Sequence, residues 1–315
     1  MRIAVLDDYQ DIARRYGDWD RLPPGAGPTV FTDHLADPEA VVARLAPFTV
    51  VCAMRERTPF PRAVLERLPE LRLLVTTGMA NASIDMAAAR ELGITVSGTG
   101  SAPAATAELT WALILALLRR VPAEDRAVRE GGWQHTVGGD LAGRTLGVIG
   151  LGRLGTRVAR VGTAFGMDVL AWSSNLTAER AEQAGARLVP KDELLRTCDV
   201  VTLHLKLSDR TRGLIGRREL DLIGPDSYLV NTSRGPIVDE AALLDALVTG
   251  RIGGAALDVY STEPLPPDHP LRTAPNTVLT PHIGYGTHDT YRVFYRETVE
   301  DIVAFLDGAP VRVLN

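Results

Sequence analysis

The stretch that most constrains the fold is residues 144–160, RTLGVIGLGRLGTRVAR, where an apolar run meets three spaced glycines. The run TLGVIG has the length of a short buried strand, and a helical pattern follows it. Gly150 permits a tight turn, Gly152 lets a phosphate approach the backbone, and Gly155 lets helix and strand pack closely. An accidental glycine turn is the alternative. The strand before the motif and the helix after it favour dinucleotide binding, with the pyrophosphate at the helix N-terminus.

The rest of the chain repeats the alternation of short apolar runs with amphipathic stretches. One series fills residues 1–100, and a second begins at residue 141 with the glycine motif. Strands that alternate with helices predict parallel sheets covered by helices on both faces. We therefore expect an α/β protein with two doubly wound domains. The last amphipathic helix, at residues 288–308, follows the nucleotide pattern and indicates that the chain returns to the first domain.

One long apolar stretch separates the two series. Residues 103–120 are expected to form a helix that crosses between the domains, and its all-round apolarity predicts burial at a subunit interface. The tail PVRVLN at residues 310–315 is consistent with either an edge strand or a final turn.

Charge, apolar runs and cysteines limit the function classes. A net charge of −5 leaves no basic footprint, so nucleic acid is not an expected partner. The longest apolar run, at residues 109–118, is too short to cross a bilayer, and the start MRIAVLDDY lacks signal-peptide features, so a cytoplasmic location is expected. Cys52 and Cys198 lie in apolar runs and belong to no ligand cluster, which predicts buried thiols and no metal site.

Ligands of open parallel sheets bind beyond the carboxyl ends of the strands. The polar residues that directly follow predicted strands are therefore the candidates for chemistry. They are Ser233 and Arg234, Asp258, Glu263 and His282.

Arg234 and His282 carry the clearest chemical meaning among these candidates. The planar guanidinium of Arg234 suits a bidentate grip on a carboxylate, and an internal salt bridge near Asp239 is the alternative. His282, next to an acidic partner, suits a general acid for a carbonyl that is being reduced, and Glu263 is the obvious partner. A purely structural histidine is the alternative. Among the other histidines only His204 also ends a strand, and it is interpreted as a packing or cofactor-side residue.

Together these stretches resemble the D-isomer-specific 2-hydroxyacid dehydrogenases over essentially the full length. NTSRGPIVDE at 231–240, GAALDVYSTEPLP at 254–266 and TPHIGY at 280–285 are similar to the family's signatures in order and spacing. The resemblance implies a Rossmann dinucleotide-binding domain, residues 102–287, inserted into a flavodoxin-like substrate domain, residues 1–101 and 288–315. It also implies a homodimer formed through the nucleotide domains.

The resemblance assigns a role to each matching residue. It implies that Arg234 binds the substrate carboxylate and carbonyl, that Glu263 keeps His282 protonated, and that His282 exchanges a proton with the substrate oxygen. Hydride transfer to or from NAD or NADP would then interconvert a 2-hydroxy acid and its 2-oxo acid without a metal. The implied cofactor-binding set is Gly150, Gly152, Arg153, Leu154, Gly155, Ser173, Thr232, Ser233, Asp258, His282 and Gly284, with Asp258 on the nicotinamide carboxamide.

The end of the second strand of the nucleotide domain departs from the usual NAD pattern. An acidic residue commonly binds the ribose hydroxyls there, but this chain has Ser173 in AWSSN. Asp168 begins the same strand, and Glu179 is expected inside the next helix behind a Thr177 cap. Without a carboxylate to repel a 2′-phosphate, NADP use or mixed specificity is favoured over strict NAD use.

The substrate loop of the first domain departs too. TTGMAN at 76–81 resembles the family's carboxylate-binding loop, with Gly78, Met79 and Ala80 offering backbone N–H groups. The family often has an Asp-Asn pair at the position of Ala82 and Ser83. Arg55 resembles an arginine that some members use near the substrate, and a solvated surface charge is the equal alternative.

Two functions of different classes fit these residues. The first is an enzyme acting on small 2-oxo acids such as glyoxylate or hydroxypyruvate. The second is a dinucleotide-sensing binding protein of the corepressor type, whose members keep the same Arg, Glu and His. No recognition segment is seen outside the two domains of this chain, which favours the enzyme.

Overall fold

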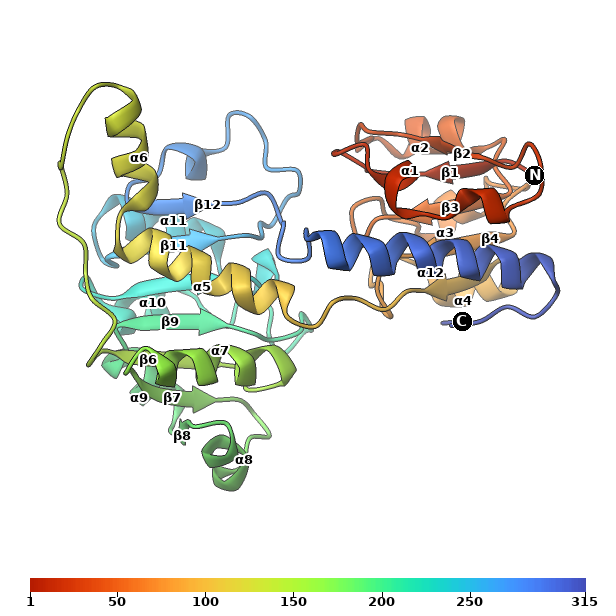
Figure 1. Cartoon of the computed structure of the whole chain (residues 1–315). Coiled ribbons are helices and arrows are strands. Elements are labelled where there is room, and N and C mark those ends of the chain that lie inside the picture. The colour runs from red at the N-terminus through yellow and green to blue at the C-terminus, as the bar shows by residue number, and fades with distance from the viewer. The chain divides into compact units, whose positions relative to one another are not determined.

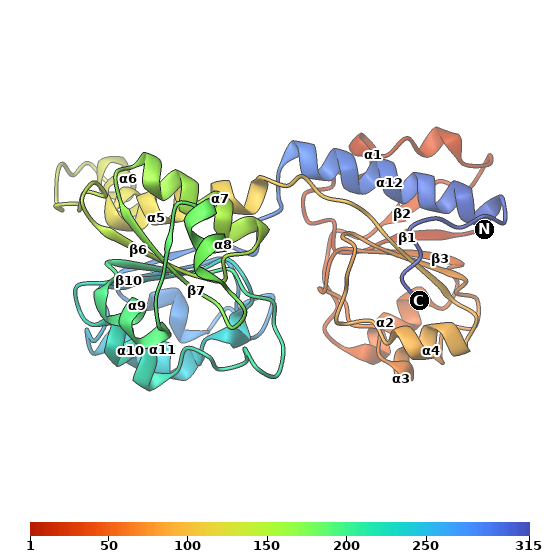
Figure 2. The same cartoon turned by 90° about the horizontal axis from the view of Figure 1, so that it is seen from below.

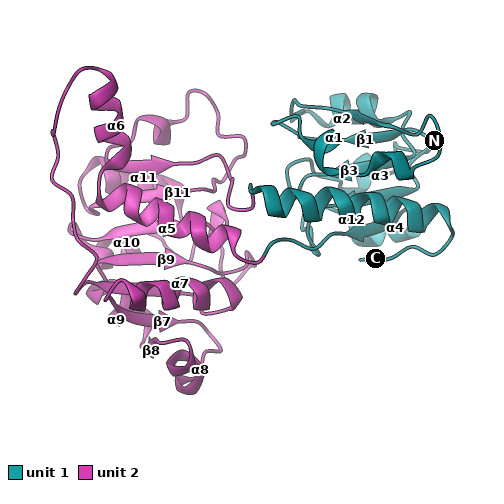
Figure 3. Cartoon of the chain, in the orientation of Figure 1, with its two compact units in different colours: residues 1–102, 286–315 teal, residues 103–285 magenta.

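The computed structural model describes all residues, 1–315, and divides into two compact units. Unit 1 comprises residues 1–102 and 286–315, and unit 2 comprises residues 103–285 (Figure 3). Each unit has its own parallel sheet, with five strands in unit 1 and seven in unit 2. The predicted α/β class with two parallel-sheet domains, one inserted into the other, is confirmed.

The sheet of unit 1 has the strand order β2-β1-β3-β4-β5, and every pair is parallel. Its strands are β1 (Ile3–Val5), β2 (Pro28–Val30), β3 (Val50–Ala53), β4 (Leu73–Thr76) and β5 (Thr95–Gly98). Its helices are α1 (Ala13–Tyr16), α2 (Pro38–Leu45), α3 (Arg62–Leu65), α4 (Met86–Glu91) and α12 (His288–Leu306). Helices α1 and α12 cover one face and α2, α3 and α4 the other (Figure 2), as the doubly wound pattern requires.

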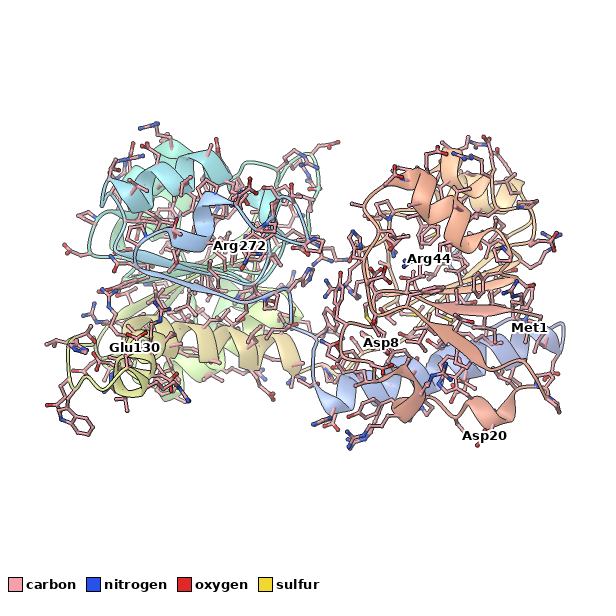
Figure 4. The ribbon with its side chains drawn as sticks, turned by 90° about the horizontal axis from the view of Figure 1, so that it is seen from above. Met1, Asp8, Asp20, Arg44, Glu130 and Arg272 are labelled. Atoms are coloured by element: carbon pink, nitrogen blue, oxygen red, sulfur yellow. The ribbon has the colours of Figure 1, made fainter.

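The charged side chains on the two faces of this sheet differ in their burial and their partners. Asp8, just past β1, lies on the side that carries α1 and α12, whereas Arg44 of α2 lies on the opposite side (Figure 4). Asp8 is buried and accepts the backbone N–H groups of Ile12 and Ala13 at 2.9 and 2.8 Å. Arg44 pairs with Asp33 at the surface. The buried carboxylate therefore organises the start of α1.

The structure decides between an edge strand and a final turn for the tail, residues 310–315. Val313 pairs antiparallel with Ser97 of β5, and the Asn315 side chain bonds both the N–H of Val96 and the carbonyl of Ile94. Arg312 reaches back to Asp301 of α12 at 2.9 Å. The tail is thus an added edge segment of the sheet of unit 1.

The sheet of unit 2 has the order β12-β11-β10-β9-β6-β7-β8, again entirely parallel. Its strands are β6 (Thr145–Ile149), β7 (Asp168–Trp172), β8 (Arg187–Leu188), β9 (Val200–Leu203), β10 (Tyr228–Asn231), β11 (Gly254–Leu257) and β12 (Thr277–Leu279). The chain starts in the middle at β6, fills one side, and crosses back to fill the other. A dinucleotide-binding sheet has this order, and its switch point lies between β6 and β9.

The helices of unit 2 also cover both faces of its sheet. They are α5 (Ala105–Leu118), α6 (Val121–Arg129), α7 (Arg153–Ala164), α8 (Ala178–Gln183), α9 (Lys191–Thr197), α10 (Arg217–Ile223) and α11 (Glu240–Val248). Figures 1 and 2 show α5 and α7 on one face and α9, α10 and α11 on the other. Apolar side chains from both faces form two separate cores around the sheet.

The long apolar helix differs from its prediction in two ways. It ends at Leu118, and after Arg120, in a left-handed conformation with φ 54°, a second helix α6 begins that the sequence pattern did not predict. Most of the apolar side chains of α5, among them Trp111, Ile114 and Leu117, are buried within unit 2. The core of unit 2 therefore accounts for much of the apolarity that suggested a subunit interface. The chain contains no helix long and apolar enough to span a membrane.

Candidate functional site

The glycine motif forms the turn between β6 and α7. Gly150 has a φ of +99°, which favours glycine, and a Cβ on Gly155 would lie 2.1 Å from the carbonyl oxygen of Gly150. Gly152 is the N-cap residue of α7, and nothing lies within 4 Å of its would-be Cβ. The first helical residues, Arg153 and Leu154, are exposed and half-buried. This open helix N-terminus fits a pyrophosphate.

Ser173 directly follows β7, next to this turn. Its carbonyl accepts the N–H of Leu176 at 3.1 Å, which forms a short turn before α8. Thr177 is the N-cap residue of α8, and Glu179 lies inside that helix. Asp168 is at the other end of β7. No acidic side chain therefore stands at the strand end where the ribose is expected.

A second group of polar residues follows the neighbouring strands β10, β11 and β12. Arg234 lies past β10, Asp258 and Glu263 past β11, and His282 past β12. The loops come close because Gly235 has no side chain: a Cβ there would lie 2.0 Å from the backbone carbon of Tyr260. The Arg-Gly pair in NTSRGP thus brings the Arg234 loop against the loop that carries Glu263.

Glu263 and His282 are in direct contact. Nδ1 of His282 lies 2.5 Å from Oε2 of Glu263, and the backbone N–H of Tyr260 donates to Oε1 of Glu263 at 2.9 Å. Both side chains are mostly buried, at 15% and 22% exposure. The ring of Tyr285 packs edge-on to the imidazole, with centroids 5.9 Å apart. Because Nδ1 faces the carboxylate, Nε2 lies on the side of the ring away from Glu263.

Asp258 holds the segment that carries His282. Its Oδ1 accepts the hydroxyl of Thr280 at 2.6 Å and the N–H of Ile283 at 2.8 Å, and its Oδ2 accepts the N–H of Gly284 at 2.8 Å. The side chain is buried, and this burial raises the pKa of Asp258. His282 itself has a left-handed backbone with φ 54°, a conformation that needs support from its surroundings.

Arg234 lies just past the carboxyl end of β10, and its Nη1 donates to the carbonyl of Ser233 at 2.8 Å. Asp239, which the sequence offered as a salt-bridge partner, is the N-cap residue of α11 and accepts the N–H of Ala242 at 3.0 Å. The neighbouring hydroxyls are used inside the unit. Ser233 bonds the carbonyl of Leu203 at 2.5 Å, and Thr232 lies 2.9 Å from the hydroxyl of Thr110.

The arginine and the glycine loop of unit 1 also meet. Arg55, with φ 53°, follows β3, and its Nη1 donates to the carbonyl of Thr77 at 3.2 Å. The N–H of Gly78 donates to Thr99 Oγ1 at 3.0 Å. The N–H group that Gly78 is expected to offer to a ligand is therefore bonded to Thr99 in this structure. Met79 is largely exposed, and Ala80 follows it at the surface.

His204 ends β9 but has a different character from His282. Its Nε2 lies 3.0 Å from the hydroxyl of Thr202. Burial lowers the pKa of His204 to about 4. It is therefore neutral near pH 7 and supports packing beneath the glycine turn, where its carbonyl oxygen lies 2.6 Å from a would-be Cβ of Gly150.

Sequence reasoning missed four residues that support this site: Thr106, Thr110, Tyr260 and Thr280. Thr106 and Thr110 are four residues apart on α5 and share a helix face, a signal that the sequence did contain. Their partners Gly284 and Thr232 are 178 and 122 residues distant, so the contacts depend on the completed fold. No cluster of three His, Cys, Asp or Glu side chains in the chain has a metal-binding arrangement.

Comparison with known proteins adds independent findings. Residues 111–284 match the family model described as D-isomer specific 2-hydroxyacid dehydrogenase, NAD binding domain. The chain is 42% identical to a glyoxylate reductase of Aeropyrum pernix, over 80% of this chain and 78% of that protein. It is 41% identical to a D-3-phosphoglycerate dehydrogenase of Archaeoglobus fulgidus, over 82% of this chain and 50% of that protein.

Solved structures of similar enzymes also match the chain. A phosphoglycerate oxidoreductase from Vibrio cholerae superposes with a TM-score of 0.93 at 37% identity, covering 98% of this chain and 100% of that one. The family model matches within unit 2, whereas the structural match covers nearly the whole chain and therefore extends across both units.

Proposed function

Because the chain belongs to the D-isomer specific 2-hydroxyacid dehydrogenases, it interconverts a D-2-hydroxy acid and its 2-oxo acid, and we propose that Arg234, Glu263 and His282 carry this reaction. The observation that carries the proposal is the 2.5 Å contact between His282 and Glu263 at the strand ends beside Arg234. The similarities give no support to a dinucleotide-sensing corepressor.

Unit 2 would hold the nicotinamide dinucleotide, which supplies or accepts the hydride when bound. Gly150, Gly152 and Gly155 leave room for the pyrophosphate, with Arg153 and Leu154 at its contact with α7. The remaining cofactor set is Ser173, Thr232, Ser233, Asp258, His282 and Gly284. For Thr232 and Ser233 the hydroxyls are engaged internally, so backbone groups would make the contact.

His282 would hold and move the proton at Nε2. The carboxylate of Glu263 accepts from Nδ1 and fixes the plane of the ring. In reduction Nε2 gives its proton to the substrate oxygen while C2 receives the hydride. In oxidation Nε2 takes that proton back.

Arg234 would bind the substrate carboxylate and offset the negative charge on the reacting oxygen. Its Nη1 donates to the carbonyl of Ser233 at 2.8 Å, which helps to fix the position of the guanidinium. Unit 1 would add Arg55 and the amides of Met79 and Ala80 as further substrate contacts. Relatives named for glyoxylate and phosphoglycerate support a small 2-oxo acid as substrate.

The cofactor preference proposed is NADP or mixed use. Support comes from Ser173, which directly follows β7 at the position where a carboxylate would repel a 2′-phosphate. Ser173→Asp should shift the ratio of kcat/KM for NADPH over NADH towards NADH at least tenfold. A wild-type enzyme that strongly prefers NADH contradicts this preference without touching the proposed reaction.

The quaternary state proposed is a homodimer formed through unit 2. Val121, Val128, Trp133 and Val137 are exposed on α6 and the loop after it. Such a concentration of exposed apolar groups favours a protein partner, here a second copy. Sedimentation that shows a monomer at micromolar concentration contradicts it.

Turnover is the direct test of the proposed function. Purified protein with NADH or NADPH and a panel of 2-oxo acids of increasing side-chain size should consume reduced cofactor with small members of the panel. Tight dinucleotide binding without turnover on any of them contradicts the catalytic roles given to Arg234, Glu263 and His282.

A further inference from the structure

The segment Thr280–Gly284 is held at both ends, and the hold at its far end comes from α5. Asp258 accepts three hydrogen bonds from this segment, and the hydroxyl of Tyr260 donates to the carbonyl of Thr280 at 2.9 Å. The carbonyl of Gly284 is a separate attachment point. It accepts the hydroxyl of Thr106 at 3.0 Å.

Thr106 also connects this segment to the loop of Arg234. The carbonyl of Thr106 accepts the hydroxyl of Thr110 at 2.8 Å, and that hydroxyl lies 2.9 Å from the hydroxyl of Thr232. Thr110 is fully buried and Thr232 nearly so. Thr232 is two residues before Arg234, and Gly284 is two residues after His282. One turn of α5 therefore links the loops that carry the two residues.

The backbone of His282 makes this hold necessary. A residue with φ near +54° that is not glycine costs free energy, so the segment needs attachments on both sides to keep that conformation. The imidazole is oriented on its Nδ1 side by Glu263. A shift of the backbone at Gly284 would rotate Nε2 of His282 away from the substrate oxygen. The bond between Nδ1 and Glu263 alone would not prevent this rotation.

We propose that Thr106 is a positioning residue for His282, acting through the carbonyl of Gly284. Through Thr110 and Thr232, Thr106 also helps to align the loop that carries Arg234. The proposal rests on the proposed roles of His282 and Arg234. It assigns to the first turn of α5 a part in catalysis without contact to substrate.

The test is Thr106→Val, which keeps the shape of the side chain and removes the hydroxyl. We expect kcat of the reductive reaction to fall about tenfold or more, because small displacements of a catalytic group carry rate losses of this order. The solvent isotope effect on kcat should rise, since proton transfer from His282 becomes more limiting. Thr106→Ser restores the hydroxyl and should restore both values.

The matched control is Thr197→Val at the end of α9, where the hydroxyl bonds the carbonyl of Glu193 in its own helix and no residue of the proposed site. It should leave kcat and the isotope effect unchanged. If Thr106→Val does not fold, Thr106→Ala removes the same hydroxyl with a residue that favours helix. A kcat within twofold of wild type in either variant, or no rescue by serine, overturns the proposal.

The ring ¹⁵N resonances of His282 give a second measurement that needs no turnover. They should move in Thr106→Val and return in Thr106→Ser. Unchanged resonances overturn the positioning role even if the wild type is active. Moved resonances together with an inactive wild type retain it and reject the proposed function.

Discussion

Each unit contains a histidine in contact with a buried or half-buried carboxylate, and the two pairs differ in what surrounds them. In unit 1 His34 Nδ1 lies 2.8 Å from Asp7, whose other oxygen accepts the hydroxyl of Thr58. In unit 2 His282 contacts Glu263, whose other oxygen accepts a backbone N–H. Both carboxylates are thus fully oriented.

The difference lies in the neighbouring strand ends. Arg234 follows the strand next but one to that of His282, and Asp258, which follows the strand between these two, fixes the segment that carries His282. Asp7 instead ties its histidine to the loop before α3, beside the Asp8 carboxylate that caps α1. Both units therefore have an arginine past a nearby strand, since Arg55 follows β3 beside β1. What distinguishes the pair of unit 2 is the buried Asp258, which fixes the backbone of the segment that carries the histidine, whereas in unit 1 the carboxylate of the pair joins two loops.

The largest effect is expected from removing the imidazole of unit 2. His282→Gln should lower kcat about 10²–10⁴-fold, the usual range for loss of a general acid, and leave the dinucleotide dissociation constant nearly unchanged. Steady-state rates and fluorescence titration measure the two quantities. His34→Gln is the matched variant in unit 1 and should keep kcat within a few-fold. Equal losses of kcat in His282→Gln and His34→Gln would contradict the different roles given to the two histidine–carboxylate pairs.

A smaller loss is expected when the cation beside the pair is removed. Arg234→Gln should lower kcat/KM for a 2-oxo acid about 10–100-fold, because a charge-assisted hydrogen bond to the substrate contributes roughly 1.5–3 kcal/mol. Arg251→Gln, which removes an arginine that pairs with Asp221 and Asp245, is the control and should not change kcat/KM. A wild-type kcat/KM in Arg234→Gln contradicts the substrate contact.

Neutralising the carboxylate partner should lower the rate through the orientation of the ring. Glu263→Gln replaces the charged acceptor of the Nδ1 hydrogen bond with a neutral amide, so kcat of reduction should fall about tenfold while the dinucleotide dissociation constant stays nearly unchanged. Steady-state rates and fluorescence titration measure the two quantities. Glu240→Gln, whose carboxylate lies 3.2 Å from His269, makes the same replacement at another histidine of unit 2 and should leave kcat unchanged. A wild-type kcat in Glu263→Gln removes that residue from its role.

The smallest effect is on stability and belongs to unit 1. Burial, together with Glu297 and Glu300, raises the pKa of Asp301 to about 7 against the pull of Arg312. The unfolded chain loses this proton near pH 4 and the folded chain near pH 7. The folded state therefore binds more protons across that window, and stability falls as pH rises through it.

Asp301→Asn should flatten this dependence by of order 1 kcal/mol, a change of about 2–4 °C in Tm. Thermal unfolding at pH 5 and pH 7.5 measures it. Asp289→Asn, an exposed partner of Arg292 on the same helix, is the control. The same slope in Asp301→Asn and wild type contradicts the assignment.

Local patterns in the sequence predicted most of the fold because most of the parallel strands are short and mainly apolar runs. Helix α6 was missed because VPAEDRAVR is polar on most sides and has a proline at its second position. Arg234, Glu263 and His282 could be selected as strand-end residues. Their contacts could not, since they depend on β10, β11 and β12 being neighbours. The bond from Gly78 to Thr99 was unpredictable for the same reason.

The antiparallel tail on β5 has a consequence for synthesis of the chain. The sheet of unit 1 begins with Ile3 and receives its last segment, around Val313, only when the final residues emerge. Unit 2 is complete once residue 285 has emerged. On the ribosome we therefore expect the second unit in the sequence to finish folding before the first, while β5 waits with an open edge for its closing segment.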